Sequence, residues 1–323
     1  MEKRKVFVTR SIPEAGLALL RQQKNVRLIV SPHDRVLTRA ELLRGVKGAD
    51  AILCLLTDKI DGAVMDSAGP QLKGIANYAV GFDNIDLAAA KKRGIWVSNT
   101  PGASTNAVAE HAVALLLALM HRLPEADRFV RAGKYKGWAP MLLTGSELPG
   151  RTLGIVGVGR IGSALAHRLA DGFGLRVVYS DVIRNIQLEK QFKAKRLSLR
   201  QLLRQADVVS LHVPLLPSTR HLIGAKELKL MKPTAYLINT SRGPVVDEKA
   251  LVTALRHQTI AGAGLDVYEF EPKLAPGLAK LNNVILTPHI ASATLEARTA
   301  MAIMAAKNII HIIAGKRPPH LAQ

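Results

Sequence analysis

The chain of 323 residues contains a single cysteine and few aromatic side chains. Cys54 alone can form neither an intramolecular disulfide nor a cluster of thiolate ligands, so a disulfide scaffold and a zinc ribbon are excluded, and we expect no metal site. Aromatic residues make up 4% of the chain, too few for the platforms on which nucleic-acid bases stack. A lone thiol is typical of a reducing compartment, and we expect a cytoplasmic protein.

Long apolar runs are also absent. The longest uninterrupted one, from Ala112 to Met120, covers about half of the ~20 residues that a membrane-spanning helix needs. The first residues, MEKRKVFVTR, place only a short apolar stretch before Thr9 and Arg10, which is too short for the core of a signal peptide. We therefore expect no membrane partner.

Acidic residues are outnumbered. The chain has 45 lysines and arginines against 25 aspartates and glutamates, a formal net charge of +20, which favours anionic partners. The basic residues are not interleaved with aromatic ones, so we interpret them as a solvated surface rather than a nucleic-acid interface. They are densest between Val182 and Gln205, where Glu189 is the single acid.

The remaining composition is that of a folded globular protein, with 48% hydrophobic and 22% charged residues over a length typical of about two domains. Short apolar runs recur between segments with helical spacing, as expected for buried strands of parallel sheets. A first series lies at 6–10, 26–30, 51–56, 74–80 and 94–99. A second series lies at 152–156, 176–180, 207–213, 235–239, 260–265 and 283–287. The sequence predicts an α/β fold with doubly wound parallel sheets.

Two long segments have helical character. Residues 105–123 are apolar on nearly every face apart from Glu110 and His111, so we expect a helix that is buried between domains or subunits. Residues 292–315 carry apolar residues at helical spacing, and Gly315 is placed to end that helix.

A glycine-rich segment follows the predicted strand at 152–156. Gly157, Gly159 and Gly162 form a G-x-G-x-x-G pattern, with Arg160 and Ile161 between the last two glycines. The glycines allow a tight turn and bring the backbone close to a diphosphate at the N-terminus of the next helix. The pattern predicts that this loop binds a dinucleotide.

Asp181 ends the strand at 176–180, at the distance after the glycine pattern where dinucleotide-binding folds place an acid. Its carboxylate can accept hydrogen bonds from both hydroxyls of the adenosine ribose and repels a 2′-phosphate, which favours NAD over NADP. Arg184 could accept a 2′-phosphate if Asp181 turned away, so NADP stays an alternative.

Polar residues follow three successive strands of the second series. They are Thr240, Ser241 and Arg242 after the first, Asp266, Glu269 and Glu271 after the second, and His289 after the third. Because the carboxyl ends of parallel strands meet at one edge of a sheet, we expect these side chains to lie close together.

This set of residues suits hydride transfer between a nicotinamide and a carbonyl carbon that neighbours a carboxylate. Arg242 has a planar guanidinium that can bind a carboxylate at two points. His289 can donate a proton in reduction and accept one in oxidation. A carboxylate beside the imidazole favours its charged form, and the spacing does not choose between Glu269 and Glu271 for this role.

Longer motifs extend over nearly the whole chain. They include NYAVGFDNID at 77–86, LINTSRGPVVDEKAL at 237–251, AGAGLDVYEFEP at 261–272 and LTPHIASAT at 286–294. Together they resemble the D-isomer-specific 2-hydroxyacid dehydrogenases, in particular the glyoxylate/hydroxypyruvate reductase branch. The resemblance implies an NAD-dependent oxidoreductase that reduces a small 2-oxo acid such as glyoxylate, hydroxypyruvate or 2-ketogluconate.

The resemblance implies catalytic roles for three residues. Arg242 matches the arginine that binds the substrate, His289 matches the acid–base histidine, and Glu271, which precedes a proline, matches the carboxylate that supports it. Asp266 matches an acid that contacts the nicotinamide carboxamide.

It also implies binding positions outside the catalytic set. The backbone at Val80 and Gly81 matches the segment that holds the substrate carboxylate. Residues expected to line the cofactor site are Thr105, Pro214, Thr240 and Ser241.

The resemblance further implies two Rossmann-like domains, with the cofactor domain inserted into a discontinuous substrate domain. We expect a substrate-binding domain at 1–100 that is completed by 291–323, and an NAD-binding domain at 101–290. A homodimer formed through the long helix is also implied, and would explain the apolar run from Ala107 to Met120.

Two other functions stay open. The sequence around GFDNID and GKYKGW also resembles phosphite dehydrogenases, although these carry a lysine where Val80 stands. A non-catalytic, NAD(H)-sensing protein or corepressor on the same fold would use the basic segment at 182–205 to bind a partner. The proton-transfer pair favours the enzyme, because a sensor does not need one.

Overall fold

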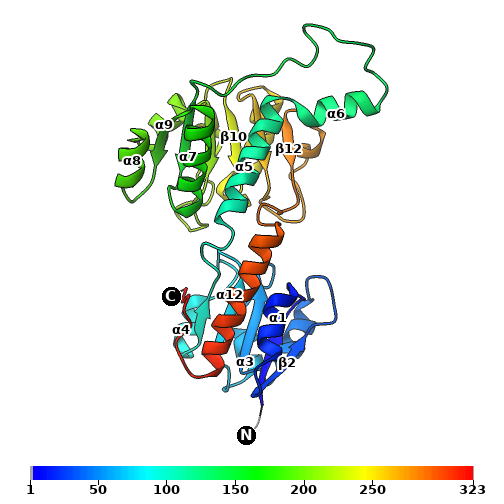
Figure 1. Ribbon diagram of the computed structural model, residues 1–323, viewed down its shortest axis with the longest axis vertical. Coiled ribbons are helices and arrows are strands. Elements are labelled where there is room, and N and C mark those ends of the chain that lie inside the picture. Colours follow the sequence, from blue (N-terminus) through cyan, green and yellow to red (C-terminus); the bar gives the residue numbers. More distant parts are fainter. Residues whose placement is uncertain (1–2, 323) are drawn as a thin grey trace. The chain divides into compact units, whose positions relative to one another are not determined.

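The computed structural model describes residues 3–322, and the chain divides into two compact units (Figure 1). Unit 1 comprises the residues up to Ser104 together with those from Ala293 onward, and unit 2 comprises Thr105–Ser292. The sequence leads us to expect these divisions after residues 100 and 290. Unit 2 is therefore an insertion in a discontinuous unit 1.

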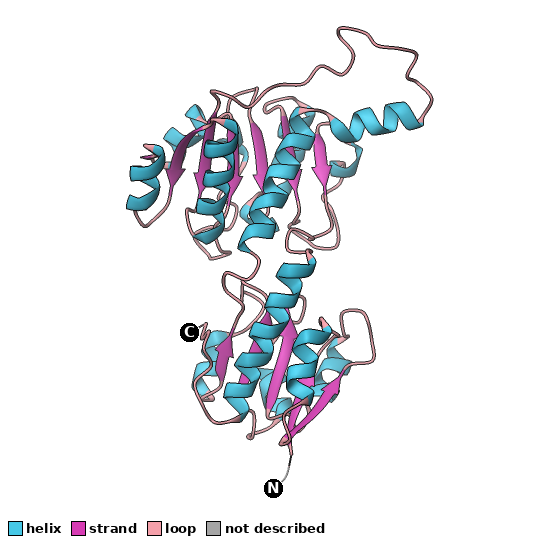
Figure 2. Ribbon diagram, viewed as in Figure 1, coloured by secondary structure: helices cyan, strands magenta, loops and turns pink. Residues whose placement is uncertain are grey.

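Unit 1 is built on a parallel sheet of five strands (Figure 2). In spatial order these are β2 (Val26–Val30), β1 (Arg4–Val8), β3 (Ala51–Leu55), β4 (Gly74–Tyr78) and β5 (Trp96–Ser98). Each strand overlaps one of the apolar runs of the first series, because the sheet is buried on both faces. The predicted α/β fold is confirmed for this unit.

Helices cover both faces of this sheet. On one face lie α1 (Glu14–Arg21) and α12 (Leu295–Ile313), and on the other lie α2 (Arg39–Val46), α3 (Gly62–Ala68) and α4 (Leu87–Lys92). Val6 and Val8 of β1 point to the first face and Phe7 points to the second, as the alternation of side chains along a strand requires. Gly16 lets α1 approach α12 closely, since a Cβ there would lie 2.6 Å from the carbonyl oxygen of Ala302.

Unit 2 contains a parallel sheet of seven strands. In spatial order these are β12 (Val284–Leu286), β11 (Gly262–Leu265), β10 (Tyr236–Asn239), β9 (Val208–Leu211), β6 (Thr152–Val156), β7 (Arg176–Ser180) and β8 (Lys195–Arg196). The helices between them are α7 (Arg160–Phe173), α8 (Ile186–Phe192), α9 (Leu199–Gln205), α10 (Ala225–Leu228) and α11 (Glu248–Arg256). The strand order reverses between β6 and β9, which is where doubly wound sheets bind their ligands.

Six of these strands overlap predicted runs, and β8 does not. Its two residues, Lys195 and Arg196, are exposed and basic, so no apolar run marks the strand. Its place is set by pairing with Val178 and Tyr179 of β7.

The apolar helix α5 (Thr105–Met120) is buried within unit 2. Ala112, Leu115 and Leu116 lie in a core shared with α7 and the sheet. Gly264 of β11 helps α5 approach, because a Cβ there would lie 3.0 Å from that of Leu115. Packing inside its own unit therefore accounts for these buried apolar residues, and the homodimer through this helix stays a prediction.

Helix α6 (Leu123–Arg131) and the chain that follows extend away from the sheet of unit 2 (Figure 1). We call residues 123–142 the arm. It exposes six large apolar side chains, Leu123, Val130, Tyr135, Trp138, Met141 and Leu142. Among the described residues no single helix is long and apolar enough to cross a membrane, and α5 and α6 meet that test only as a pair bent by 59°.

Candidate active site

The glycine-rich loop joins β6 to α7 where the strand order reverses. Gly157 has a φ of 92°, and a Cβ there would lie 2.7 Å from the carbonyl oxygen of His212. At Gly162 a Cβ would lie 2.2 Å from the carbonyl oxygen of Gly157, so both positions require glycine. Gly159 lies at the N-cap position before α7 and provides no side-chain cap, and outside its chain neighbours no described atom lies within 4 Å of where its Cβ would be. The N-terminus of α7, at residues 160–162, is therefore open and fits a diphosphate.

Asp181 directs its carboxylate toward this loop. Its Oδ2 accepts a hydrogen bond from the Val158 N–H at 2.7 Å, and its Oδ1 accepts one from the Ile183 N–H at 3.0 Å. Each carboxylate oxygen has a second acceptor site, so Asp181 can still bind ribose hydroxyls. The donors and acceptors at this edge of the sheet fit a dinucleotide.

Arg184, the alternative anchor for a 2′-phosphate, is paired with Glu189. Its Nη2 lies 2.7 Å and its Nε 2.8 Å from Oε2 of Glu189. The Tyr179 hydroxyl donates to the same carboxylate at 2.6 Å. Arg184 and Tyr179 together lower the pKa of Glu189, so the charge of Arg184 is balanced within this chain.

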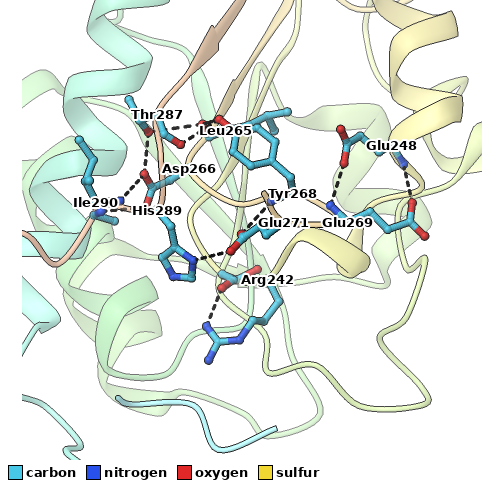
Figure 3. Close-up of polar contacts among 12 residues, drawn as sticks. Arg242, Glu248, Leu265, Asp266, Tyr268, Glu269, Glu271, Thr287, His289 and Ile290 are labelled. Carbon is cyan, nitrogen blue, oxygen red and sulfur yellow. Dashed lines mark hydrogen bonds and ion pairs between the residues drawn. The ribbon is translucent and has the colours of Figure 1, made fainter. Parts of the chain in front are cut away.

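The loop after β12 places His289 opposite Glu271 (Figure 3). Nδ1 of His289 lies 2.9 Å from Oε2 of Glu271, whose Oε1 accepts the Tyr268 N–H at 3.0 Å. Burial raises the pKa of Glu271, but the hydrogen bond and charge of His289, the Tyr268 N–H and the Arg242 charge together hold it below the ordinary value. Because Nδ1 faces Glu271, Nε2 is the nitrogen available for proton exchange with a substrate.

Asp266 follows β11, is fully buried, and holds the loop that carries His289. Its backbone carbonyl accepts the His289 N–H at 2.9 Å. Its carboxylate accepts the Ile290 N–H at 2.8 Å and the Ala291 N–H at 2.7 Å. These contacts make Asp266 a positioning residue for His289, and its contact with a nicotinamide carboxamide stays a prediction.

Two further residues of this network were not found by sequence reasoning. The Thr287 hydroxyl donates to Oδ1 of Asp266 at 2.7 Å and lies 3.0 Å from Nε2 of His111. Since the hydroxyl proton is directed to the carboxylate, Thr287 accepts a hydrogen bond from Nε2–H of His111. The one signal for His111 in the sequence was its polarity on an otherwise apolar helix.

Glu269 lies on the side of its loop opposite Glu271 and pairs with His221, with 2.7 Å between Oε1 and Nε2 (Figure 3 labels both glutamates). The Glu269 N–H donates to Oε2 of buried Glu248 at 2.7 Å, and the Glu248 N–H donates back to Oε2 of Glu269 at 3.4 Å. The spacing did not choose between Glu269 and Glu271 as the partner of His289. In the structure Glu271 contacts His289, and Glu269 does not.

The segment after β10 is organised by Asn239. Its Oδ1 accepts from the N–H and the hydroxyl of Ser241, at 3.0 and 2.8 Å, and its Nδ2 donates to the carbonyl oxygen of Arg242 at 3.0 Å. Gly243 packs directly on the next loop, since a Cβ there would lie 1.8 Å from the carbonyl oxygen of Tyr268. The segments that carry Arg242 and Glu271 are therefore in contact.

Other candidates from the sequence lie around this edge or in unit 1. The Thr240 hydroxyl is buried and has no hydrogen-bond partner among the described residues, and Pro214 is exposed after β9. Thr105 is the first residue of α5. Val80 and Gly81 belong to unit 1, in the loop that follows β4.

Comparison with protein families gives one match and many curated relatives. The model described as "D-isomer specific 2-hydroxyacid dehydrogenase, NAD binding domain" matches residues 113–291. A glyoxylate reductase from Thermococcus litoralis is 51% identical, with 99% of this chain and 96% of that protein covered. A glyoxylate reductase from Pyrococcus furiosus is 49% identical, with 99% of this chain and 95% of that protein covered.

Solved structures are similar over both units. A protein from Thermus thermophilus has a TM-score of 0.91 and 45% identity, with 99% of this chain and 100% of that chain covered. An NADPH-dependent glyoxylate/hydroxypyruvate reductase from Sinorhizobium meliloti, in complex with NADP and malonate, has a TM-score of 0.86 and 32% identity, with 99% of this chain and 97% of that chain covered. The chain therefore belongs to the D-isomer specific 2-hydroxyacid dehydrogenase family and is an oxidoreductase that acts on the CH–OH group of donors, with an NAD-binding domain in unit 2.

Proposed function

We propose that this enzyme is an NADH-dependent glyoxylate reductase that also reduces hydroxypyruvate, with 2-ketogluconate as a larger candidate substrate. The observation that carries the proposal is the 2.9 Å pairing of His289 with Glu271, beside the segment of Arg242. A proton donor and a carboxylate-binding guanidinium are what reduction of a 2-oxo acid needs. The name glyoxylate reductase, carried by relatives that are 51% and 49% identical, supports the smallest of these acids.

The chain's own residues handle the proton and the carboxylate. A reduced nicotinamide, when bound, supplies the hydride that adds to the carbonyl carbon of the substrate. His289 donates the proton on Nε2 to the carbonyl oxygen as the C=O π bond breaks, so that glyoxylate becomes glycolate. The carboxylate of Glu271 stabilises the imidazolium before that transfer. Arg242 binds the substrate carboxylate and polarises the neighbouring carbonyl.

We assign the cofactor to the edge of the sheet in unit 2. The open N-terminus of α7 would receive the diphosphate, and Asp181 would accept hydrogen bonds from the ribose. Asp181 is directed toward the glycine-rich loop, and Arg184 is paired with Glu189, which supports NAD over NADP. The Sinorhizobium relative is NADPH-dependent, so both cofactors are to be compared directly.

The two units then have separate tasks. Unit 1 is the substrate-binding domain, with the backbone at Val80 and Gly81 holding the substrate carboxylate, and unit 2 is the cofactor domain. Thr105, Pro214, Thr240, Ser241 and Asp266 line the cofactor site.

We also propose a homodimer, with the arm as the contact surface. Most apolar side chains of α5 are buried within unit 2, whereas Trp138 and Met141 of the arm are 83% and 80% exposed. Exposed apolar residues gathered on one projecting segment are typical of a protein–protein contact. A second copy of the chain is the partner that fits the homodimer implied by the family resemblance.

Steady-state oxidation of NADH and NADPH tests the proposal, with glyoxylate, hydroxypyruvate, pyruvate and 2-ketogluconate as acceptors. We expect turnover with glyoxylate and NADH, and loss of turnover in His289→Asn with NADH binding retained. NADH binding without turnover on any acid would instead favour the sensor. Reduction of NAD with phosphite would favour the phosphite dehydrogenase.

A further inference from the structure

The loop after β4, at residues 79–84, directs successive backbone carbonyls into unit 1. The carbonyl oxygen of Ala79 accepts the Thr100 N–H at 2.9 Å. The carbonyl oxygen of Val80 accepts a hydrogen bond from Nδ2 of Asn99 at 2.7 Å. Both partners lie directly after β5, so the loop after β4 is held by its neighbour in the sheet.

The next carbonyl is held by a second asparagine. Nδ2 of Asn77, the penultimate position of β4, donates to the carbonyl oxygen of Gly81 at 2.9 Å and to Oδ1 of Asn84 at 2.9 Å. Nδ2 of Asn84 in turn donates to the carbonyl oxygens of Leu55 at 3.1 Å and Asp58 at 3.0 Å. This side-chain network links the loop after β4 to the loop after β3.

The direction of these carbonyls fixes the direction of the amides. In a trans peptide the C=O and the N–H share one plane and point to opposite sides. A carbonyl of Ala79 that points inward therefore turns the Val80 N–H outward, and the inward carbonyl of Val80 does the same for Gly81. Among residues 3–322 neither of these two N–H groups donates a hydrogen bond, so both are free to bind an anion.

The two asparagines are buried, and their role needs an amide. Asn77 is fully buried and Asn99 is 8% exposed. A buried amide donor is costly unless its hydrogen bonds are made, and here those bonds are made to the loop carbonyls. An apolar residue of the same size would leave the carbonyls of Val80 and Gly81 without these partners.

We propose that Asn77 and Asn99 are positioning residues that aim the Val80 and Gly81 amides at the carboxylate of the substrate, with Asn84 bracing Asn77. The proposal rests on the reduction of a 2-oxo acid proposed above and deepens it. It assigns recognition of the carboxylate partly to side chains that do not touch the substrate.

The test uses Asn99→Asp and Asn77→Asp in the full-length enzyme. Each change keeps the shape of the side chain and replaces the donor by an oxygen that repels the loop carbonyl. We expect the KM for glyoxylate to rise about tenfold, which corresponds to the loss of roughly one hydrogen bond's net contribution. We expect the KM for NADH to change by less than about twofold and kcat to be largely retained, because the reacting groups are untouched.

Asn283→Asp is the matched control. Nδ2 of Asn283 also donates to two backbone carbonyls, those of Leu255 at 3.1 Å and Ala261 at 3.2 Å, but it lies in unit 2 before β12. A merely structural role predicts lower thermal stability and less active protein for all three variants, with KM unchanged. A role in aiming the amides predicts that KM for glyoxylate rises in the two variants of unit 1 alone.

The outcomes separate the two proposals. If the natural enzyme reduces no 2-oxo acid, the proposed function is wrong. If it does, and folded Asn99→Asp and Asn77→Asp have its KM for glyoxylate, the positioning role is wrong. Should fully buried Asn77 tolerate no substitution, Asn99→Ser, which also removes the amide donor to the Val80 carbonyl, provides the comparison at Asn99 alone.

Discussion

Nδ1 of His289 lies 2.9 Å from Oε2 of Glu271, and the backbone of His289 takes a left-handed φ of 56° at that position. A non-glycine residue in this region is strained by about 1–3 kcal/mol, which surrounding contacts must offset. Here the His289 N–H is held by the carbonyl of Asp266, whose carboxylate holds the next two amides. The ring is therefore oriented from its backbone and from its side chain at once.

Replacing the carboxylate of this pair tests its electrostatic role. In Glu271→Gln we expect kcat for glyoxylate reduction to fall about 10²-fold, because a neutral amide no longer stabilises the imidazolium that donates the proton. Binding of NADH should be unchanged. The variant Glu269→Gln is the control, since Glu269 contacts His221 instead. Equal losses of kcat in both variants would contradict the assignment.

The hydroxyl of Thr287 connects His111 to Asp266, and its removal should loosen the loop of His289. We expect Thr287→Val to destabilise the protein by about 1–3 kcal/mol, because Asp266 loses a buried donor, and to lower kcat as well. Thr287→Ser keeps the hydroxyl and should restore both. Chemical denaturation and steady-state kinetics measure the two effects. If Thr287→Ser loses as much stability and kcat as Thr287→Val, the hydroxyl is not the group that holds the loop.

Cofactor choice should depend on the charge of Asp181. Asp181→Asn keeps an acceptor for the Val158 N–H but removes the repulsion of a 2′-phosphate. We expect the preference for NADH over NADPH, as a ratio of kcat/KM values, to narrow about tenfold. Arg184→Gln should leave this ratio nearly unchanged, because Arg184 is paired with Glu189. A ratio that is insensitive to Asp181 would show that the charge does not discriminate.

Stability should fall in mild acid because of His212. Its ring nitrogens are buried, which lowers its pKa from 6.5 to about 4. As the pH falls, the unfolded chain binds this proton first, so stability is lost between pH 6.5 and 4, by up to about 3 kcal/mol. Urea unfolding at several pH values in that window measures the slope. His212→Gln should flatten it, and an unchanged slope would assign the effect to other groups.

The arm should control the oligomeric state. We expect the double change Trp138→Ser and Met141→Ser to convert a dimer to a monomer in sedimentation experiments, because it removes two of the most exposed apolar side chains. Leu216→Ser is the control, since Leu216 is 49% exposed and lies outside the arm. A variant that stays dimeric would move the interface elsewhere.

Local sequence patterns predicted the parts of the fold that local chemistry determines. Apolar runs marked the buried strands, and the glycines at 157–162 marked the turn that only small residues can make. Strand β8 was missed because its residues are held by pairing with β7 rather than by burial. The long apolar helix was predicted, but its packing against α7 and the sheet was not, since those contacts join residues far apart in the sequence.

The sequence predicted the site residues that follow the strands, but it did not predict the contacts that hold them in place. Strand order brings Arg242, Glu271 and His289 to one edge, which a sequence can indicate. The contact between His111 and Thr287 joins residues 176 positions apart, and no spacing rule reports it. Asn77 and Asn99, which hold the loop of Val80, were not predicted either, because a buried amide produces no periodic pattern in the sequence.

The discontinuity of unit 1 also constrains how the protein is made. Helix α12 supplies Met301, Ala305 and Ile309 to the core that covers β1, β3 and β4. During synthesis α1 alone can cover that face of the sheet until residues 295–313 have left the ribosome, whereas unit 2 has all of its strands earlier. The inserted unit can therefore complete its fold first. The N-terminal residues of unit 1 are synthesised earliest, but they complete their core only when α12 has been made.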